Sequence, residues 1–398
     1  METITQELLE NSLGDFAYNN KILVYQADPA LAELLDINCD GIFLEPLLFG
    51  YFNNPDLKPP ISLTQVLYGY IEPEKRPASV GLIFTNNAAY LPQLGTFHLL
   101  VDEPVVEAFL RYTDGELSFA DAGGVALPFR LEPIRSLGDF ELVTTNHPFF
   151  HRFLHQANPA VPYSVVRTIE MKEIALALCG NVEKALGIVK ECCPAFYEMA
   201  LLANSKLIFF DYPLINSFAT RNLLGAVFFS SSLDYSGVAF YIDDLIHQMA
   251  HNILNALIFD KMQYFTSDIE LLPFAPYSSD PNESRDIFNT FHGMLTCSFR
   301  VSCFREILQK DRLMTPEERN EVIARYIDQD RRFMNGPLKL PMDELFTEDG
   351  IELYEEIKQV AIDCLDDIRP LISKADFSNQ VSRFSYAKYL EKNAQLKV

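Results

Sequence analysis

The sequence is organised around residues 243–257, which read Asp243-Asp244-Leu245-Ile246-His247-Gln248-Met249-Ala250-His251-Asn252-Ile253-Leu254-Asn255-Ala256-Leu257. The run holds neither glycine nor proline, and its spacing predicts a helix over 243–259. Residues four apart share one helical face, so His247 and His251 point at one spot. Two imidazoles aimed at one spot suit a first-row transition metal. His292, which precedes Gly293, is the third histidine that we assign to a metal site.

Composition and charge exclude several classes of protein. The chain has 398 residues, a net charge of −23 and a pI near 4.7, which disfavours nucleic-acid binding because phosphate contacts need clustered Lys and Arg. Its seven cysteines form no CxxC pair, a pattern typical of reduced thiols. We find neither a secretion signal nor an apolar run of the roughly 18 residues that a membrane span needs. We therefore expect a cytoplasmic protein.

The order of predicted elements indicates an α+β fold that is predominantly helical. Residues 1–140 form a mixed α/β N-terminal region. Residues 141–310 form the metal-binding catalytic domain, in which a small sheet precedes the paired-histidine helix. Residues 311–398 form a C-terminal helical region that packs on the catalytic domain. The oligomeric state does not follow from the sequence.

Individual elements follow from apolar spacing and from turn and cap residues. Runs rich in β-formers predict strands at 80–84, 96–101, 116–119, 206–210, 225–230 and 238–242. Helical spacing predicts helices at 1–15, 169–178, 182–202, 288–304 and 347–372, with breaks at Gly180 and Pro194. Thr315 and Glu318 predict a capping box that starts a further helix.

The residue after the first histidine limits the chemistry. Zinc hydrolases with this histidine pair place a Glu there as general base, whereas this chain has Gln248, whose amide accepts no proton near neutral pH. A zinc-dependent hydrolase would therefore need another base. A non-haem iron oxygenase needs three protein ligands and no such base. The alternative that binds no metal is a helix with two hydrogen-bonded histidines.

The third iron ligand is open to alternatives. His292 is one, and four carboxylates would serve instead or would support the ligands: Asp244, Asp280, Glu283 and Asp286. A second histidine series, His147, His151 and His155, also recurs every four residues. We interpret that series as structural, because Phe149 and its apolar neighbours supply the buried stripe of that segment.

Three segments carry a resemblance to a known family: residues 245–257, the Pro-rich loop 273–281 with its Asp280-Pro281 pair, and His292-Gly293. Together they resemble a family of HExxH-motif peptide-modification proteins. The helix of that family reads Leu-hydrophobic-His-Glu-x-x-His-x-x-x-Asn-Ala-Leu. The resemblance covers roughly residues 145–310. This chain departs from it at Gln248, and at Ser278 and Asn282, where we would expect arginines.

The resemblance implies a 2-oxoglutarate-dependent, non-haem Fe(II) enzyme that hydroxylates a side-chain Cβ of a ribosomally made peptide. It would place Fe(II) on His247, His251 and His292, with Gln248 beside the ligands; zinc is the alternative metal. Arg285 or Arg300 would bind the 2-oxoglutarate carboxylate through charge-assisted hydrogen bonds. A degenerate, non-catalytic peptide-binding partner protein is the alternative that the departures favour.

Overall fold

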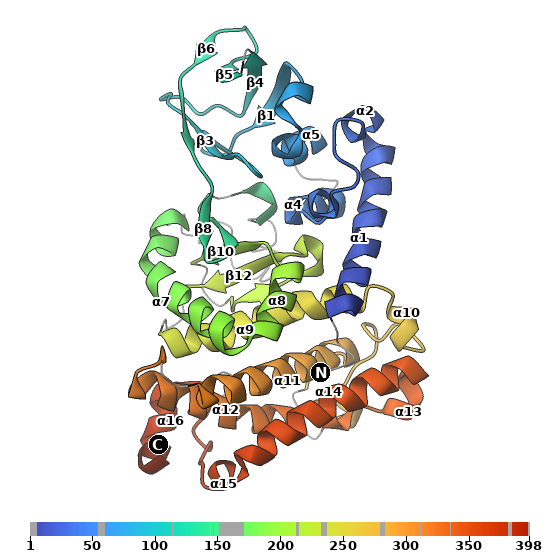
Figure 1. Cartoon of the computed structure of the whole chain (residues 1–398), viewed down its shortest axis with the longest axis vertical. Helices are drawn as coiled ribbons and strands as arrows, with labels where there is room; N and C mark the ends of the chain where they lie inside the picture. Colours follow the sequence, from blue (N-terminus) through green and yellow to red (C-terminus); the bar gives the residue numbers. More distant parts are fainter. Residues whose placement is uncertain are drawn as a thin grey trace. The chain divides into compact units, whose positions relative to one another are not determined.

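The chain folds into two compact units, each assembled from segments far apart in sequence (Figure 1). The helical unit comprises Met1–Ser12, Gly180–Ala203 and Asp234–Val398, and the sheet unit comprises Leu13–Cys179 and Asn204–Leu233. The computed structural model describes residues 6–54, 60–113, 115–145, 147–150, 171–211, 215–231, 237–278, 283–310, 313–334, 336–380 and 384–396.

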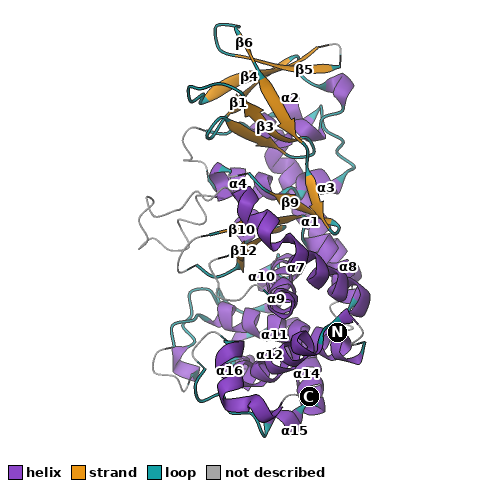
Figure 2. Ribbon diagram, turned by 90° about the vertical axis from the view of Figure 1, so that its left-hand side faces the viewer, coloured by secondary structure: helices purple, strands orange, loops and turns teal. Residues whose placement is uncertain are grey.

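The sheet unit holds all the named strands of the described residues, drawn in orange in Figure 2. One of its sheets has the order β11–β12–β10–β9–β8, with β10 parallel to both β9 and β12. Its strands are β8 (Arg135–Leu137), β9 (Phe140–Val143), β10 (Lys206–Phe210), β11 (Phe218–Ala219) and β12 (Ala226–Ser230). Each residue of β10 and β12 is buried, as expected for parallel strands that are apolar except for Lys206 and Ser230 at their ends.

The other sheets of this unit are antiparallel. One has the order β1–β4–β5–β6 and the other the order β2–β3–β7. Their strands are β1 (Ser79–Ile83), β2 (Ala88–Leu91), β3 (Gly95–Leu99), β4 (Glu107–Thr113), β5 (Glu116–Ala120), β6 (Ala126–Leu127) and β7 (Phe129–Glu132). The unit also contains α2 (Pro29–Ala32), α3 (Asp40–Phe43), α4 (Pro46–Asn53) and α5 (Leu63–Leu67).

The helical unit is built around α11, which packs against α9, α12 and α14 (Figure 1). Its helices are α8 (Pro194–Ala203), α9 (Val238–Leu257), α10 (Lys261–Tyr264), α11 (Ile287–Gln309), α12 (Pro316–Met334), α13 (Met342–Leu345), α14 (Glu348–Asp367), α15 (Arg369–Ile372) and α16 (Tyr386–Asn393). Helices α1 (Gln6–Ala27) and α7 (Met171–Cys192) contribute residues to both units. No helix of the described residues is long and apolar enough to cross a bilayer.

The α+β class with mostly helical content is confirmed, but the two units do not follow the expected regions 1–140, 141–310 and 311–398. Parallel pairing of β10 with β9 joins residues near 206 to the sheet of the N-terminal half. Packing of α11 on α12 and α14 joins the C-terminal helices to the histidine helix. The pairing of β10 with β9 links residues far apart in sequence, which a division by composition does not detect.

Most predicted elements are present, with two informative errors. The strand expected at 238–242 is wrong, because those residues form the start of α9. All five are buried, so the segment lacks the polar face by which a helix is recognised in sequence. The break at Gly180 is also wrong, since α7 runs through it, whereas Pro194 does begin α8. The capping box is confirmed: Glu318 N donates to Thr315 Oγ1 at 3.2 Å, and Thr315 N to Glu318 Oε2 at 2.7 Å.

Candidate metal centre

Helices α9 and α11 bring the three predicted histidines together. His247 and His251 lie one turn apart on α9, and His292 comes from the second turn of α11, which Asp286 caps through the backbone N–H of Asn289 at 2.6 Å. Most residues of α9 are apolar and buried, including those on either side of the face that carries His247 and His251. His292 itself is buried, and the Phe288 ring packs against its imidazole with 4.3 Å between centroids.

The three imidazoles form a continuous series. Nε2 of His247 lies 3.2 Å from Nε2 of His251, and Nδ1 of His251 lies 3.1 Å from Nδ1 of His292. The rings of His251 and His292 meet through these nitrogens, with centroids 5.3 Å apart and planes inclined by 23°. His251 is therefore the central member and uses a different ring nitrogen toward each neighbour.

These distances fit neighbouring ligands of one metal ion. Two nitrogens bound at about 2.1 Å and at right angles would lie roughly 3.0 Å apart. Nevertheless, no group of three or more His, Cys, Asp or Glu side chains among the described residues is arranged to hold a metal. His251 faces His292 with Nδ1 and His247 with Nε2, so its two contacts lie on different edges of the ring. The three imidazoles therefore form two pairwise contacts, and their nitrogens do not meet at one point.

Burial and positive charge keep two of these imidazoles neutral. Burial, followed by the Arg300 charge, lowers the pKa of His251 to about 4. Burial, Arg300 and His251 also hold the pKa of His247 well below its ordinary value. Metals bind imidazole in its neutral form, so the electrostatics suit ligation.

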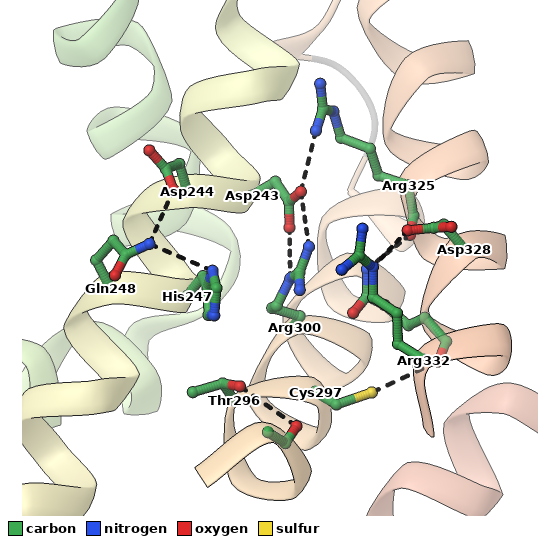
Figure 3. Close-up of polar contacts among 12 residues, drawn as sticks. Asp243, Asp244, His247, Gln248, Thr296, Cys297, Arg300, Arg325, Asp328 and Arg332 are labelled. Atoms are coloured by element: carbon green, nitrogen blue, oxygen red, sulfur yellow. Dashed lines mark hydrogen bonds and ion pairs between the residues drawn. The ribbon is translucent and has the colours of Figure 1, made fainter. Parts of the chain in front are cut away.

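Gln248 stands beside the histidines as a hydrogen-bond donor (Figure 3). Its Nε2 lies 3.1 Å from Oδ1 of Asp244 and 3.3 Å from Nδ1 of His247, and the side chain is buried. An amide accepts no proton at neutral pH, so this residue orients its neighbours and cannot act as the general base of a hydrolase. We therefore place Gln248 in contact with a candidate ligand and give it no proton-transfer role.

Arg300, expected to hold 2-oxoglutarate, instead pairs with Asp243 (Figure 3). Its Nε and Nη2 donate to the two carboxylate oxygens at 2.6 and 2.8 Å, and Arg325 donates to the same carboxylate at 3.0 Å. Burial alone would raise the pKa of Asp243, but the two guanidinium charges hold it below its ordinary value. The carboxylate that Arg300 binds is thus supplied by the protein itself.

Arg285 likewise binds a protein carboxylate, that of Glu283, two residues before it in sequence. Its Nε and Nη2 donate to Glu283 at 2.9 and 2.6 Å, and its guanidinium lies 5.6 Å from the centroid of the Phe274 ring. Both predicted arginines thus already bind a carboxylate through two N–H groups. In this arrangement neither fits the role of holding a co-substrate carboxylate.

The remaining sequence candidates have other positions or lie outside the described residues. Asp286 caps α11, Glu283 pairs with Arg285, and Asp244 accepts from Gln248. Three residues of the loop 273–281, namely Ser279, Asp280 and Pro281, lie outside the described residues, as do His151 and His155. His147 is buried in the sheet unit, where burial and the Lys206 charge lower its pKa to about 3. That position agrees with a structural interpretation.

A buried polar cluster in the sheet unit was not anticipated from the sequence. Lys206, 2% exposed, donates to Glu141 at 2.6 Å and to the Tyr90 hydroxyl at 2.9 Å, and lies 3.3 Å from Glu45. The Tyr90 hydroxyl also donates to Glu141, and Tyr70 donates to Glu45 at 2.6 Å. The sequence signal was the lysine that opens the otherwise apolar strand β10. Because the Lys206 ammonium group contacts the carboxylates of both Glu141 and Glu45, we interpret the cluster as structural.

Comparison with known proteins adds no relative: no known protein family matches the sequence, and a search of curated proteins finds no match. The family resemblance therefore rests on the motif residues themselves, namely the histidine helix, the Asp-Pro loop and His292-Gly293.

Proposed function

We propose that the chain is an iron-dependent peptide hydroxylase in which His247, His251 and His292 bind Fe(II). One observation carries the proposal: three buried or half-buried imidazoles from α9 and α11 follow one another at nitrogen–nitrogen distances of 3.2 and 3.1 Å. Iron bound there would supply the activation of dioxygen. The protein then needs no general base, which agrees with Gln248 at the position where a zinc hydrolase has Glu.

The side chains around the histidines have supporting roles in this proposal. Phe288 packs on His292, and the apolar residues of α9 flank His247 and His251; this partial burial favours neutral imidazoles. Arg300, held by Asp243, adds a positive charge that further opposes protonation of His251. The resemblance implies 2-oxoglutarate as co-substrate and a ribosomal precursor peptide as substrate. The proposal keeps both but assigns neither Arg300 nor Arg285 to the co-substrate.

A second candidate, a non-catalytic peptide-binding partner protein, is favoured by a different observation. Gln248 replaces the motif Glu, and both arginines near the histidines bind protein carboxylates. A site that had lost its metal would retain the histidines as a hydrogen-bonded series. The two candidates differ in whether the purified protein keeps a metal ion.

Anaerobic reconstitution separates them. We expect the protein mixed with Fe(II) and 2-oxoglutarate to retain one iron per chain and to develop a weak visible charge-transfer band. The His292→Ala variant should lose both signals, whereas His98→Gln, a change in the sheet unit, should keep them. Protein that retains no iron and shows no band would overturn the proposal and favour the non-catalytic partner. Protein that retains iron but shows no band would contradict 2-oxoglutarate as the co-substrate and leave the iron site in place.

A further inference from the structure

We infer that Asp244, acting through Gln248, sets the positions of the ring protons on the three histidines and thereby opposes metal binding at the same site. This inference rests on the proposed metal centre and adds its regulation. Asp244 is a positioning residue here, since it touches Gln248 and acts on the ligands only through that amide.

Gln248 turns the nitrogen end of its amide toward both Asp244 and His247. The Gln248 amide nitrogen donates to Oδ1 of Asp244 at 3.1 Å, so the amide oxygen points away from this carboxylate. That nitrogen carries two N–H groups. One donates to Asp244, and the other points at Nδ1 of His247, 3.3 Å away. Figure 3 shows Gln248 between these two partners.

The hydrogen bond from Gln248 determines which nitrogen of each histidine ring carries the proton. A neutral imidazole has one donor and one acceptor nitrogen. Since Nδ1 of His247 accepts, its proton lies on Nε2, which donates to Nε2 of His251 at 3.2 Å. His251 then carries its proton on Nδ1 and donates to Nδ1 of His292 at 3.1 Å. One direction of donation therefore runs from Gln248 through all three histidines.

This order of ring protons opposes a metal ion. A metal between His247 and His251 needs both Nε2 lone pairs, so the proton of His247 must move to Nδ1. A ligating histidine normally donates that N–H to an acceptor. Here it would meet the Gln248 nitrogen, a donor. Turning the amide would offer its oxygen to His247 but would place that oxygen against the Asp244 carboxylate, at a separation of 3.1 Å.

Asp244→Asn tests the inference, because asparagine keeps the shape but can donate as well as accept. Gln248 can then present its oxygen to His247 without opposing a carboxylate. We expect the variant to bind Co(II), followed by its visible absorption, roughly 10- to 100-fold more tightly than the parent protein, the range over which such supporting residues alter metal affinity. A purely electrostatic role predicts the reverse, since removal of a negative charge weakens cation binding. The control is Glu352→Gln, an exposed carboxylate of α14, which should leave affinity unchanged.

Nitrogen-15 NMR of the metal-free protein provides a second readout that does not depend on metal. We expect the ring proton on Nε2 of His247, Nδ1 of His251 and Nε2 of His292, and a partial shift of the His247 proton to Nδ1 in Asp244→Asn. A proton on Nδ1 of His247 in the parent protein would overturn the inference. So would equal or weaker Co(II) binding by the variant. If neither protein binds Co(II), the proposed metal centre fails, and the NMR result alone decides whether Asp244 orders the ring protons.

Discussion

Asp243 on α9 accepts two hydrogen bonds from Arg300 on α11, at 2.6 and 2.8 Å, and both side chains are buried. Asp243 lies one turn before His247, and Arg300 lies two turns after His292. The pair therefore joins the two helices that supply the candidate ligands. Arg325 extends it to α12 with a hydrogen bond of 3.0 Å to the same carboxylate.

Asp243→Ala should destabilise the helical unit strongly. The change removes the carboxylate that the buried Arg300 guanidinium binds, whereas Arg325 keeps its pair with Glu321. Breaking such a buried pair destabilises by about 3–5 kcal/mol. Urea unfolding followed by circular dichroism measures the difference. Arg369→Ala, which removes an exposed pair with Asp366, is the control and should leave the midpoint nearly unchanged. A loss for Asp243→Ala no larger than that of the control would contradict a stabilising role of the pair.

Stability of the sheet unit should fall as the pH drops below about 6.5, partly because of His147. The pKa of His147 is about 3 in the folded protein, against an ordinary value of 6.5. Between pH 3 and pH 6.5, His147 is therefore protonated in the unfolded chain and neutral in the folded chain. The stabilisation is complete above pH 6.5 and is lost at about 1.4 kcal/mol per pH unit as the pH falls.

The matched variant for this pH dependence is His147→Asn. Nδ1 of His147 accepts from the backbone N–H of Phe149 at 3.2 Å, and an asparagine oxygen can accept there without titrating. Unfolding free energies at pH 7, 6 and 5 should decline less steeply in the variant, by the contribution of one proton. His247 and His251, whose pKa values are also lowered, remain in both proteins. Identical slopes would show that His147 is not the group responsible.

Gln248→Glu restores the motif residue but should destabilise the metal-free protein at neutral pH. The new carboxylate would lie where the amide now donates to Asp244, at 3.1 Å, and two adjacent carboxylates repel. Combination with Asp244→Asn should recover most of the loss, giving a clear coupling energy in a double-mutant cycle. Additive effects would contradict the contact. A zinc hydrolase would instead gain peptidase activity from Gln248→Glu, which can be assayed on the same variant.

The interior of the histidine helix was predictable because its evidence is local. Spacing within one helix places His247 beside His251, and the Thr315–Glu318 capping box involves residues three apart. The first turns of α9 were not predictable, since Val238 to Ile242 are buried on all sides and resemble a strand. Local patterns identify an element only where one face of it meets water.

The carboxylate partner of Arg300 was not predictable, because it is remote in sequence. Asp243 precedes Arg300 by 57 residues, and only the packing of α9 on α11 brings them together. Lys206 and Glu141 are likewise separated by 65 residues and meet through the pairing of β10 with β9. Sequence shows which charges exist; the fold decides which of them are paired.

The measurement that tests the central claim most directly is the metal content of the anaerobically reconstituted protein and of three variants, His247→Ala, His251→Ala and His292→Ala. The account predicts one Fe(II) per chain in the parent protein, with imidazole nitrogens around the iron in its X-ray absorption spectrum. Each variant should lose most of the metal while its circular dichroism stays unchanged. Iron that is absent from the parent protein, or retained equally by all three variants, would contradict the assignment of these histidines as ligands.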